Sequence, residues 1–180
     1  GQVSLHTNYS SDFKVQNGAS ILFEHTPIPF IEEWVKTFVS EFKFTGQIAF
    51  DFIQTEDEKY IPIECNPRST SGIHLLSNIP EFTHAFMNGQ RRFIIQPSNG
   101  SSAILKLPML AYGLSSIRSI KQLRKWFKAM RSKDVIFKAS DPIPSIHQLI
   151  TFFEFWIRGI KLGLDPIQAS TYDIEFNGDL

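Results

Sequence analysis

The sequence is poor in the residues that build disulfides and metal clusters. It has one cysteine, which excludes a disulfide within the chain and a cysteine-cluster zinc site. Its five histidines are scattered, with no His-x-His or His-x-x-x-His spacing, so we expect no histidine-based metal site. No uncharged apolar run approaches the roughly 18 residues that a membrane span needs, and no signal-peptide pattern is seen. We therefore expect a cytoplasmic protein with no membrane partner.

Net charge is also absent, because 18 Lys and Arg balance 18 Asp and Glu. This balance excludes a globally basic nucleic-acid binder and an acidic disordered tail. A length of 180 residues suits one domain, or one domain with an appended lobe. The chain begins at Gly1 without Met and runs straight into an alternating segment, so we expect it to be part of a longer protein.

Hydrophobic periodicity predicts an α+β fold in which helices pack on an antiparallel sheet, followed by a mostly helical extension. The Pro-, Ser-, Asn- and Gly-rich segment Gln96–Ser102 is the best candidate boundary, which gives domains at residues 1–96 and 97–180. The predicted strands cover residues 2–10, 19–25, 47–54, 59–66, 134–137 and 171–176. The predicted helices cover residues 29–43, 72–77, 80–88, 117–132 and 144–162.

The strands at 47–54 and 59–66 are joined by a polar connection of hairpin length. An even-length loop places Asp51 opposite Glu64 and Ala49 opposite Asn66, whereas an odd-length loop breaks this register. Since side chains alternate along a strand, these residues share one face. That face is predicted to carry Ala49, Asp51, Ile53, Pro62, Glu64 and Asn66, and the opposite, apolar face Ile48, Phe50, Phe52, Ile61, Ile63 and Cys65.

Two carboxylates about 5 Å apart at Cβ repel each other unless something neutralises them. A hard divalent cation does so, and Mg²⁺ typically completes its coordination with substrate phosphates. Arg68 adds a bidentate donor suited to phosphate, and the segment 69–72 offers hydroxyls and backbone amides at a predicted helix start. The alternative interpretation is that Asp51 and Glu64 are ordinary solvated carboxylates.

Two stretches, Gly46–Ile53 and Tyr60–His74, resemble the C-terminal part of an ATP-grasp domain, and the carbamoyl-phosphate-synthase-like branch is the most similar. The Glu-x-Asn-Pro-Arg element at 64–68 carries most of this resemblance. The resemblance implies that Mg²⁺ or Mn²⁺ binds with ATP to Asp51, Glu64 and Asn66. It also implies that Arg68 contacts the transferred phosphate. The residues implied to line the adenine pocket are Ile53 and Ile63.

The resemblance implies an ATP-dependent carboxylate ligase with an acyl-phosphate intermediate, acting on a small-molecule carboxylate and a nucleophile. It covers about residues 1–88. The family's glycine-rich lid and ATP-binding lysines precede the matching region, so we expect this chain to lack the N-terminal part of its own module. Alone, it should be inactive or nearly so. A second interpretation is a non-catalytic binding or assembly module that uses the basic segment 118–133 and the apolar helix 144–162.

Between Arg118 and Lys133 the sequence has seven basic residues and no acid. A surface for nucleic acid or acidic membrane is one interpretation. The preferred interpretation is a solvated face opposite an apolar stripe that includes Ile117, Leu123 and Phe127, so nucleic acid is not expected as a partner. We expect Cys65 to be buried and His74 to have a structural role.

Overall fold

The computed structural model describes residues 1–10, 13–15, 20–87 and 93–173. The chain forms two compact units, Gly1–Val135 and Ile136–Leu180. Strands and helices are mixed within the first unit, and the described strand pairs are antiparallel with one exception, so the α+β class is confirmed. The predicted boundary between residues 96 and 97 was based on composition, not compactness, and stays a prediction.

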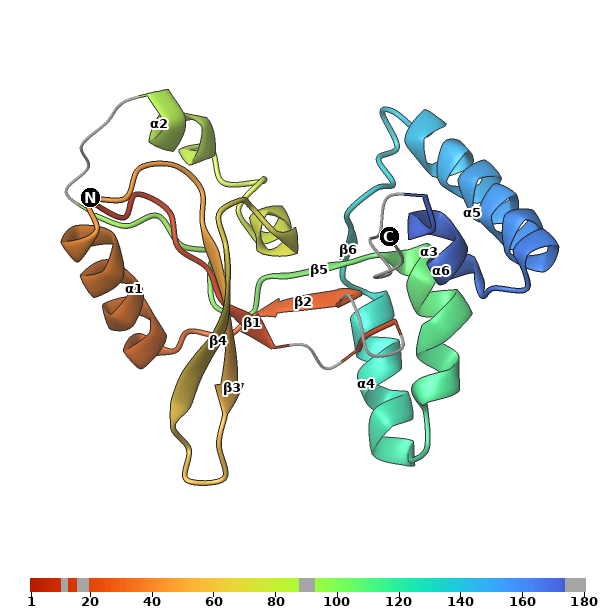
Figure 1. The fold of residues 1–180 in the computed structure, drawn as a ribbon, viewed down its shortest axis with the longest axis horizontal. Helices are drawn as coiled ribbons and strands as arrows, with labels where there is room; N and C mark the ends of the chain where they lie inside the picture. Colours follow the sequence, from red (N-terminus) through yellow and green to blue (C-terminus); the bar gives the residue numbers. More distant parts are fainter. Residues whose placement is uncertain (11–12, 16–19, 88–92, 174–180) are drawn as a thin grey trace, which may run out of the picture. The chain divides into compact units, whose positions relative to one another are not determined.

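The first unit is built on a four-stranded sheet in the order β1 (Tyr9–Ser10), β2 (Leu22–His25), β5 (Ser102–Ile104) and β6 (Lys133–Asp134) (Figure 1). Only the β5–β6 pair is parallel among these described strands. The sheet holds the core because its central strands are apolar on both faces. The largest fully buried side chains are Phe23, Ile21, Ile104 and Met109.

A separate hairpin, β3 (Ala49–Gln54) with β4 (Tyr60–Asn66), packs against helix α1 (Pro29–Glu41). Pro29 starts this helix, where its missing N–H costs no hydrogen bond. The Trp34 ring lies 5.0 Å from the ring of Phe50 and 5.3 Å from that of Phe52, edge to face in both cases. Helix α1 therefore covers one face of the hairpin.

Short helical segments complete the first unit. Two follow the hairpin, η1 (Ser71–Leu75) and α2 (Phe82–Met87). After β5, the chain forms α3 (Lys106–Pro108), η2 (Met109–Gly113), η3 (Leu114–Ser116) and α4 (Ile120–Met130). The Ser119 side chain caps α4 by accepting from the Gln122 backbone N–H at 3.2 Å. Trp126 of α4 is buried and donates its Nε1–H to the Met109 carbonyl at 3.3 Å, which fixes α4 against η2.

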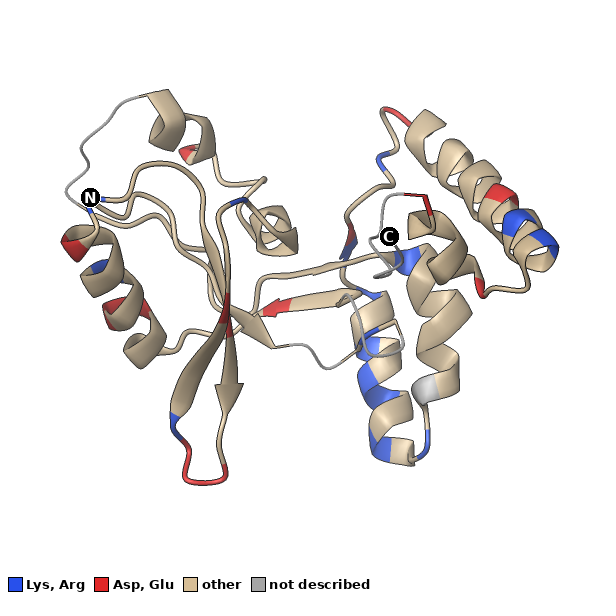
Figure 2. Cartoon of the chain, viewed as in Figure 1, with Lys and Arg blue, Asp and Glu red and all other residues tan. Residues whose placement is uncertain are grey.

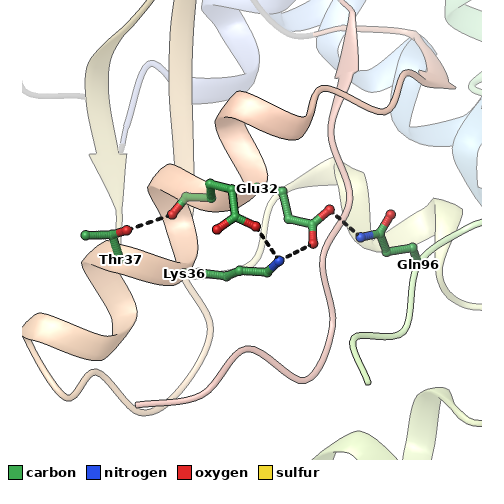
Figure 3. A network of polar contacts seen from close by, with 5 residues as sticks. Glu32, Lys36, Thr37 and Gln96 are labelled. Carbon is green, nitrogen blue, oxygen red and sulfur yellow. Dashed lines mark hydrogen bonds and ion pairs between the residues drawn. The ribbon is translucent and has the colours of Figure 1, made fainter. Parts of the chain in front are cut away.

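A polar network ties α1 to the segment just before β5 (Figure 3). The Lys36 ammonium lies 2.7 Å from a Glu32 carboxylate oxygen, and Gln96 donates to the other Glu32 oxygen at 2.8 Å. The bond between Gln96 and Glu32 spans 64 positions of sequence. The hydrogen bond from Lys36 lowers the pKa of the Glu32 carboxyl, and the bond from Gln96 lowers it further. The network thus fixes the position of the helix that supports the hairpin.

The second unit consists mainly of α5 (Ile143–Leu162) and α6 (Pro166–Thr171), which pack on each other. Gly163 ends α5 in a left-handed conformation, φ +69°, and its N–H bonds to the Gly159 carbonyl. Asp165 caps α6, because its carboxylate accepts from the backbone N–H groups of Ile167 and Gln168. No helix in the described part of the chain combines the length and the apolar character needed to cross a membrane.

Several predicted elements are shorter than expected, and one is wrong. The strand predicted at 2–10 reduces to Tyr9–Ser10, preceded by an isolated bridge between Leu5 and Ile95. The strand predicted at 171–176 is wrong over 171–173, because Thr171 ends α6 and a turn follows; residues 174–176 lie outside the described part. Strand β5 starts inside the segment predicted as a linker.

Candidate active site

The predicted pairing of the two acids is confirmed. Asp51 lies opposite Glu64, and Ala49 lies opposite Asn66. The loop length on which the prediction relied is wrong, however. The Thr55 N–H bonds to the Lys59 carbonyl and the Glu58 N–H to the Thr55 carbonyl, which defines a three-residue turn. A β-bulge between Asp51 and Phe52 adds one residue to β4 and restores the register.

The bulge changes which residues share a face nearer the turn. Ile61 pairs with Ile53 and Pro62 pairs with Phe52. Alternation then places Ile61 on the side of the acids and Pro62 on the side of α1, the reverse of the prediction. Ile53 and Ile61 are 51% and 49% exposed, so the acidic face continues into an uncovered apolar patch.

The site residues on the acidic face are linked by one polar contact. Asn66 donates its Nδ2–H to a Glu64 carboxylate oxygen at 3.0 Å. This bond orients the amide so that its oxygen remains available as a ligand beside the carboxylates. Asp51 and Glu64 are exposed, and Asn66 is half-buried. Within the described residues, neither acid is paired with a cation, so nothing in this part of the chain offsets their mutual repulsion.

Arg68 is exposed just beyond these residues. One guanidinium nitrogen donates to the Ser69 carbonyl at 3.4 Å, and the Arg68 backbone N–H bonds to the Asn66 carbonyl at 2.7 Å. The turn thus places the cation next to the end of β4. The helix start expected after it is present, but η1 is a five-residue 3₁₀ turn, and the side chain of its N-cap residue Thr70 accepts no hydrogen bond from the backbone of the turn. So short a turn does not support the anion-binding site that the sequence suggested at residues 69–72.

Tyr9 also belongs to this region, and nothing in its sequence spacing marks it. A side-chain hydrogen bond joins Tyr9 to Thr70, and the ring packs against Gly72, where an added Cβ would lie 3.1 Å from Tyr9 Cε1. Burial raises the pKa of the Tyr9 phenol, and the negative charge of Asp51 raises it further. Tyr9 therefore links the central sheet to the segment that carries Arg68.

The two isoleucines implied to line an adenine pocket differ in placement. Ile53 lies on the face of Asp51, paired with Ile61. Ile63 is the extra residue of the bulge and has no partner on β3. It is 59% exposed. The apolar pair next to the acids is therefore Ile53 with Ile61, and Ile61 was missed because sequence alternation alone does not reveal a bulge.

Two further residues can be compared with expectation. Cys65 was expected to be buried, but it is exposed. The α1 rings contact Phe50, Phe52 and Tyr60 on the same face of the hairpin. His74 is partly buried, with its ring 6.2 Å from that of Phe23. Burial lowers the pKa of His74, which fits a packed imidazole.

The donor set fits a hard cation. Two carboxylates and one amide oxygen, with room on an exposed face for waters or phosphate oxygens, match the ligands that Mg²⁺ prefers. Among the residues that the structure describes, no group of three or more His, Cys, Asp or Glu side chains is arranged to hold a metal. In the described part of the chain, the oxygen donors on this face are therefore two carboxylates and one amide.

Comparison with known proteins adds no further constraint: no protein-family model, no curated protein and no solved structure matches the chain.

Proposed function

We propose that this chain supplies the metal-binding half of the active site of an ATP-dependent carboxylate ligase of the ATP-grasp type. The observation that carries the proposal is the direct pairing of Asp51 with Glu64 across two strands, with Asn66 bonded to Glu64. Opposed acids on a sheet are destabilising, so their placement here calls for a cation. The Glu-x-Asn-Pro-Arg element contains two of these three residues, Glu64 and Asn66, together with Arg68.

In this proposal each side chain has a distinct task. Asp51, Glu64 and the Asn66 amide oxygen supply hard oxygen ligands. Magnesium bound there with ATP would supply charge neutralisation at the phosphates. The Arg68 guanidinium would donate hydrogen bonds to the phosphoryl oxygens as the γ-phosphoryl group of ATP passes to the carboxylate substrate with release of ADP. A nucleophile then attacks the acyl phosphate and releases inorganic phosphate. Ile53 and Ile61 offer an apolar surface beside the ligands, suited to a nucleotide base.

Metal binding is the first test, since it needs only this chain. Binding of Mn²⁺ is measured by the loss of the free-ion electron paramagnetic resonance signal. We expect Asp51→Asn and Glu64→Gln each to weaken binding by at least roughly tenfold, because second-shell residues alone contribute about 10- to 100-fold. The matched controls Asp57→Asn and Glu56→Gln remove the same charges at the exposed hairpin tip. Equal binding by the site variants and the controls contradicts the proposal.

Nucleotide protection is the second test. ATP with Mg²⁺ should raise the unfolding temperature of an intact-length version, which includes the N-terminal part of the module, more than Mg²⁺ alone, and Asp51→Asn or Glu64→Gln should abolish the difference. Protection that survives both substitutions contradicts a ligase site here.

A second candidate function is a non-catalytic assembly module, favoured by the uncovered apolar surface of α5. Ile146 and Phe153 are each 55% exposed, and Trp156 is 50% exposed. Under this alternative Asp51 and Glu64 bind no metal ion, so the Mn²⁺ experiment distinguishes the two candidate functions directly.

A further inference from the structure

Helix α4 leaves an apolar stripe in solvent, contrary to its sequence pattern. The pattern predicts that Leu123 and Phe127 pack on a core while the basic residues face water. The structure instead buries Trp126 and Ala129. It leaves Ile120, Leu123 and Phe127 at 73%, 37% and 57% exposed. The apolar face of the helix is therefore wider than its contact with the domain: the edge with Trp126 and Ala129 packs on the core, and the other edge stays exposed.

A basic stripe runs directly beside the exposed apolar one. The basic stripe consists of Lys121, Arg124 and Lys128. Each of its residues directly follows one residue of the apolar stripe, so both stripes have the i, i+3, i+7 spacing. The two stripes therefore run next to each other along the helix. Figure 2 shows the basic residues gathered along α4.

Few acids offset this charge. Lys128 lies 3.0 Å from Glu24, while Lys121, Arg124 and Arg131 form no ion pair with any described residue. The sequence has no acidic residue between Glu81 and Asp134, although the whole chain has no net charge. The surface is therefore basic and apolar at once, and its complement is an anionic surface with an apolar layer beneath.

We propose that the outer face of α4, defined as Ile120, Lys121, Leu123, Arg124, Phe127 and Lys128, docks on the anionic headgroups of a lipid surface. The cations bind lipid phosphates and carboxylates, and the three apolar side chains enter the interfacial layer. Nucleic acid would engage the cations but gives Ile120 and Leu123 no apolar environment, so a lipid surface fits both stripes. The helix lies on the membrane and does not cross it. This proposal replaces the expectation of no membrane partner and is independent of the proposed ligase activity.

The test is co-sedimentation of the full chain with phosphatidylcholine vesicles, with and without about one third phosphatidylserine. We expect binding to the vesicles that contain phosphatidylserine, little binding to pure phosphatidylcholine, and loss of binding at high salt. Equal binding to both vesicle types, or no binding to either, overturns the proposal.

Two double variants separate the contribution of the basic stripe to vesicle binding from that of the apolar stripe. Lys121→Glu with Arg124→Glu should weaken binding by at least roughly tenfold. The matched control, Lys59→Glu with Lys138→Glu, changes the net charge equally at exposed positions outside α4 and should bind like the unmodified chain. Ile120→Ser with Phe127→Ser should also reduce binding, whereas a purely electrostatic contact would leave it unchanged.

Circular dichroism checks that the variants fold; if one does not, the salt dependence of the unmodified chain decides. Binding to RNA or to polyglutamate without binding to phosphatidylserine vesicles overturns the lipid assignment in favour of those partners.

Discussion

Asp51 faces Glu64 across the β3–β4 ladder although the turn between their strands has an odd number of residues. Near the turn, the ladder pairs Phe52 with Pro62, and an uninterrupted continuation would put Ile63 opposite Asp51. The extra residue in β4 shifts the register by one and puts Glu64 there instead. Bulges often re-aim side chains next to functional sites, so this one acts directly on the proposed metal ligands.

The opposed acids make a prediction about stability without metal. Asp51→Asn removes one charge of a repelling pair, so it should raise the free energy of unfolding by about 0.5 kcal/mol at low salt. Salt should shrink this gain through screening, and saturating Mg²⁺ should reverse it, since only the unmodified chain gains from the ion. Urea unfolding with and without Mg²⁺ measures both effects. If Asp57→Asn gives the same gain and the same reversal, the effect reports total charge and not the pair.

The turn makes a second prediction. Glu58 has φ +61°, in the left-handed region that β-branched residues disfavour. Glu58→Val should lower the free energy of unfolding by about 1 kcal/mol or more, whereas Glu58→Gly should leave it unchanged or raise it. Thermal or urea unfolding of both variants provides the measurement. A valine variant as stable as the glycine variant would show that the turn adopts another conformation.

Much of the site could be predicted because its residues are local in sequence. Alternation predicts both strands of the hairpin, and Pro29 with the spacing of Trp34 and Phe38 predicts the helix that backs them. The bulge was missed although Pro62 stands directly beside it, because a proline inside a strand marks either an edge or a bulge and does not say which. The pairing of Asp51 with Glu64 was reached through an incorrect loop length. The wrong loop length and the missed bulge offset each other at Asp51 and Glu64, so their pairing was predicted correctly. They do not offset each other nearer the turn, where the predicted face of Ile61 is wrong.

Long-range features were the least predictable. Tyr9 reaches Thr70 through strand pairing that sequence spacing does not encode. For α4, periodicity predicted one apolar face, but Trp126 and the apolar stripe compete for burial. The larger ring packs against Met109, so Leu123 and Phe127 remain outside.

His6 makes the stability depend on pH. Its Nε2 is buried and has no hydrogen-bond partner among the described residues. Burial lowers the pKa of its imidazole, an effect that Glu32 opposes and that His25 and Lys36 reinforce. Because the folded state disfavours the charged form, the stability that neutral His6 contributes is complete above the unfolded value of 6.5. It is lost as the pH falls below that value.

The variant His6→Gln should therefore show a flatter fall in the free energy of unfolding between about pH 7 and pH 5. Urea unfolding over that range tests this, with exposed His84→Gln as the control. An unchanged profile for His6→Gln would assign the dependence to other groups, of which His74 is the first to examine, because burial lowers its pKa too.

Trp34 should stabilise the folded chain and also support the proposed metal site. Its ring contacts Phe38, Phe50 and Phe52, at centroid distances of 5.0 to 5.6 Å. Trp34→Ala should lower the free energy of unfolding by about 3 kcal/mol, and it should weaken Mn²⁺ binding although it changes no ligand, because the hairpin loses its support. Phe93→Ala, at a position 65% exposed, is the control and should cost less than about 1 kcal/mol. Full Mn²⁺ affinity in Trp34→Ala would mean that the hairpin holds its register unaided.

Gly159 sets how closely α5 approaches the turn that follows it. The residue is buried, and an added Cβ would lie 2.7 Å from the Leu164 carbonyl oxygen, a backbone atom that has no rotamer by which to move away. Gly159→Ala should therefore destabilise the packing of α6 on α5 by about 1–3 kcal/mol, even though alanine is the better helix former. Thr151→Ala, on an exposed turn of the same helix, gains the same propensity without the clash and should be neutral or slightly stabilising. Thermal unfolding followed by far-ultraviolet circular dichroism compares the two variants, and a Gly159→Ala protein as stable as Thr151→Ala would mean that the Leu164 turn can move away from the helix at no cost.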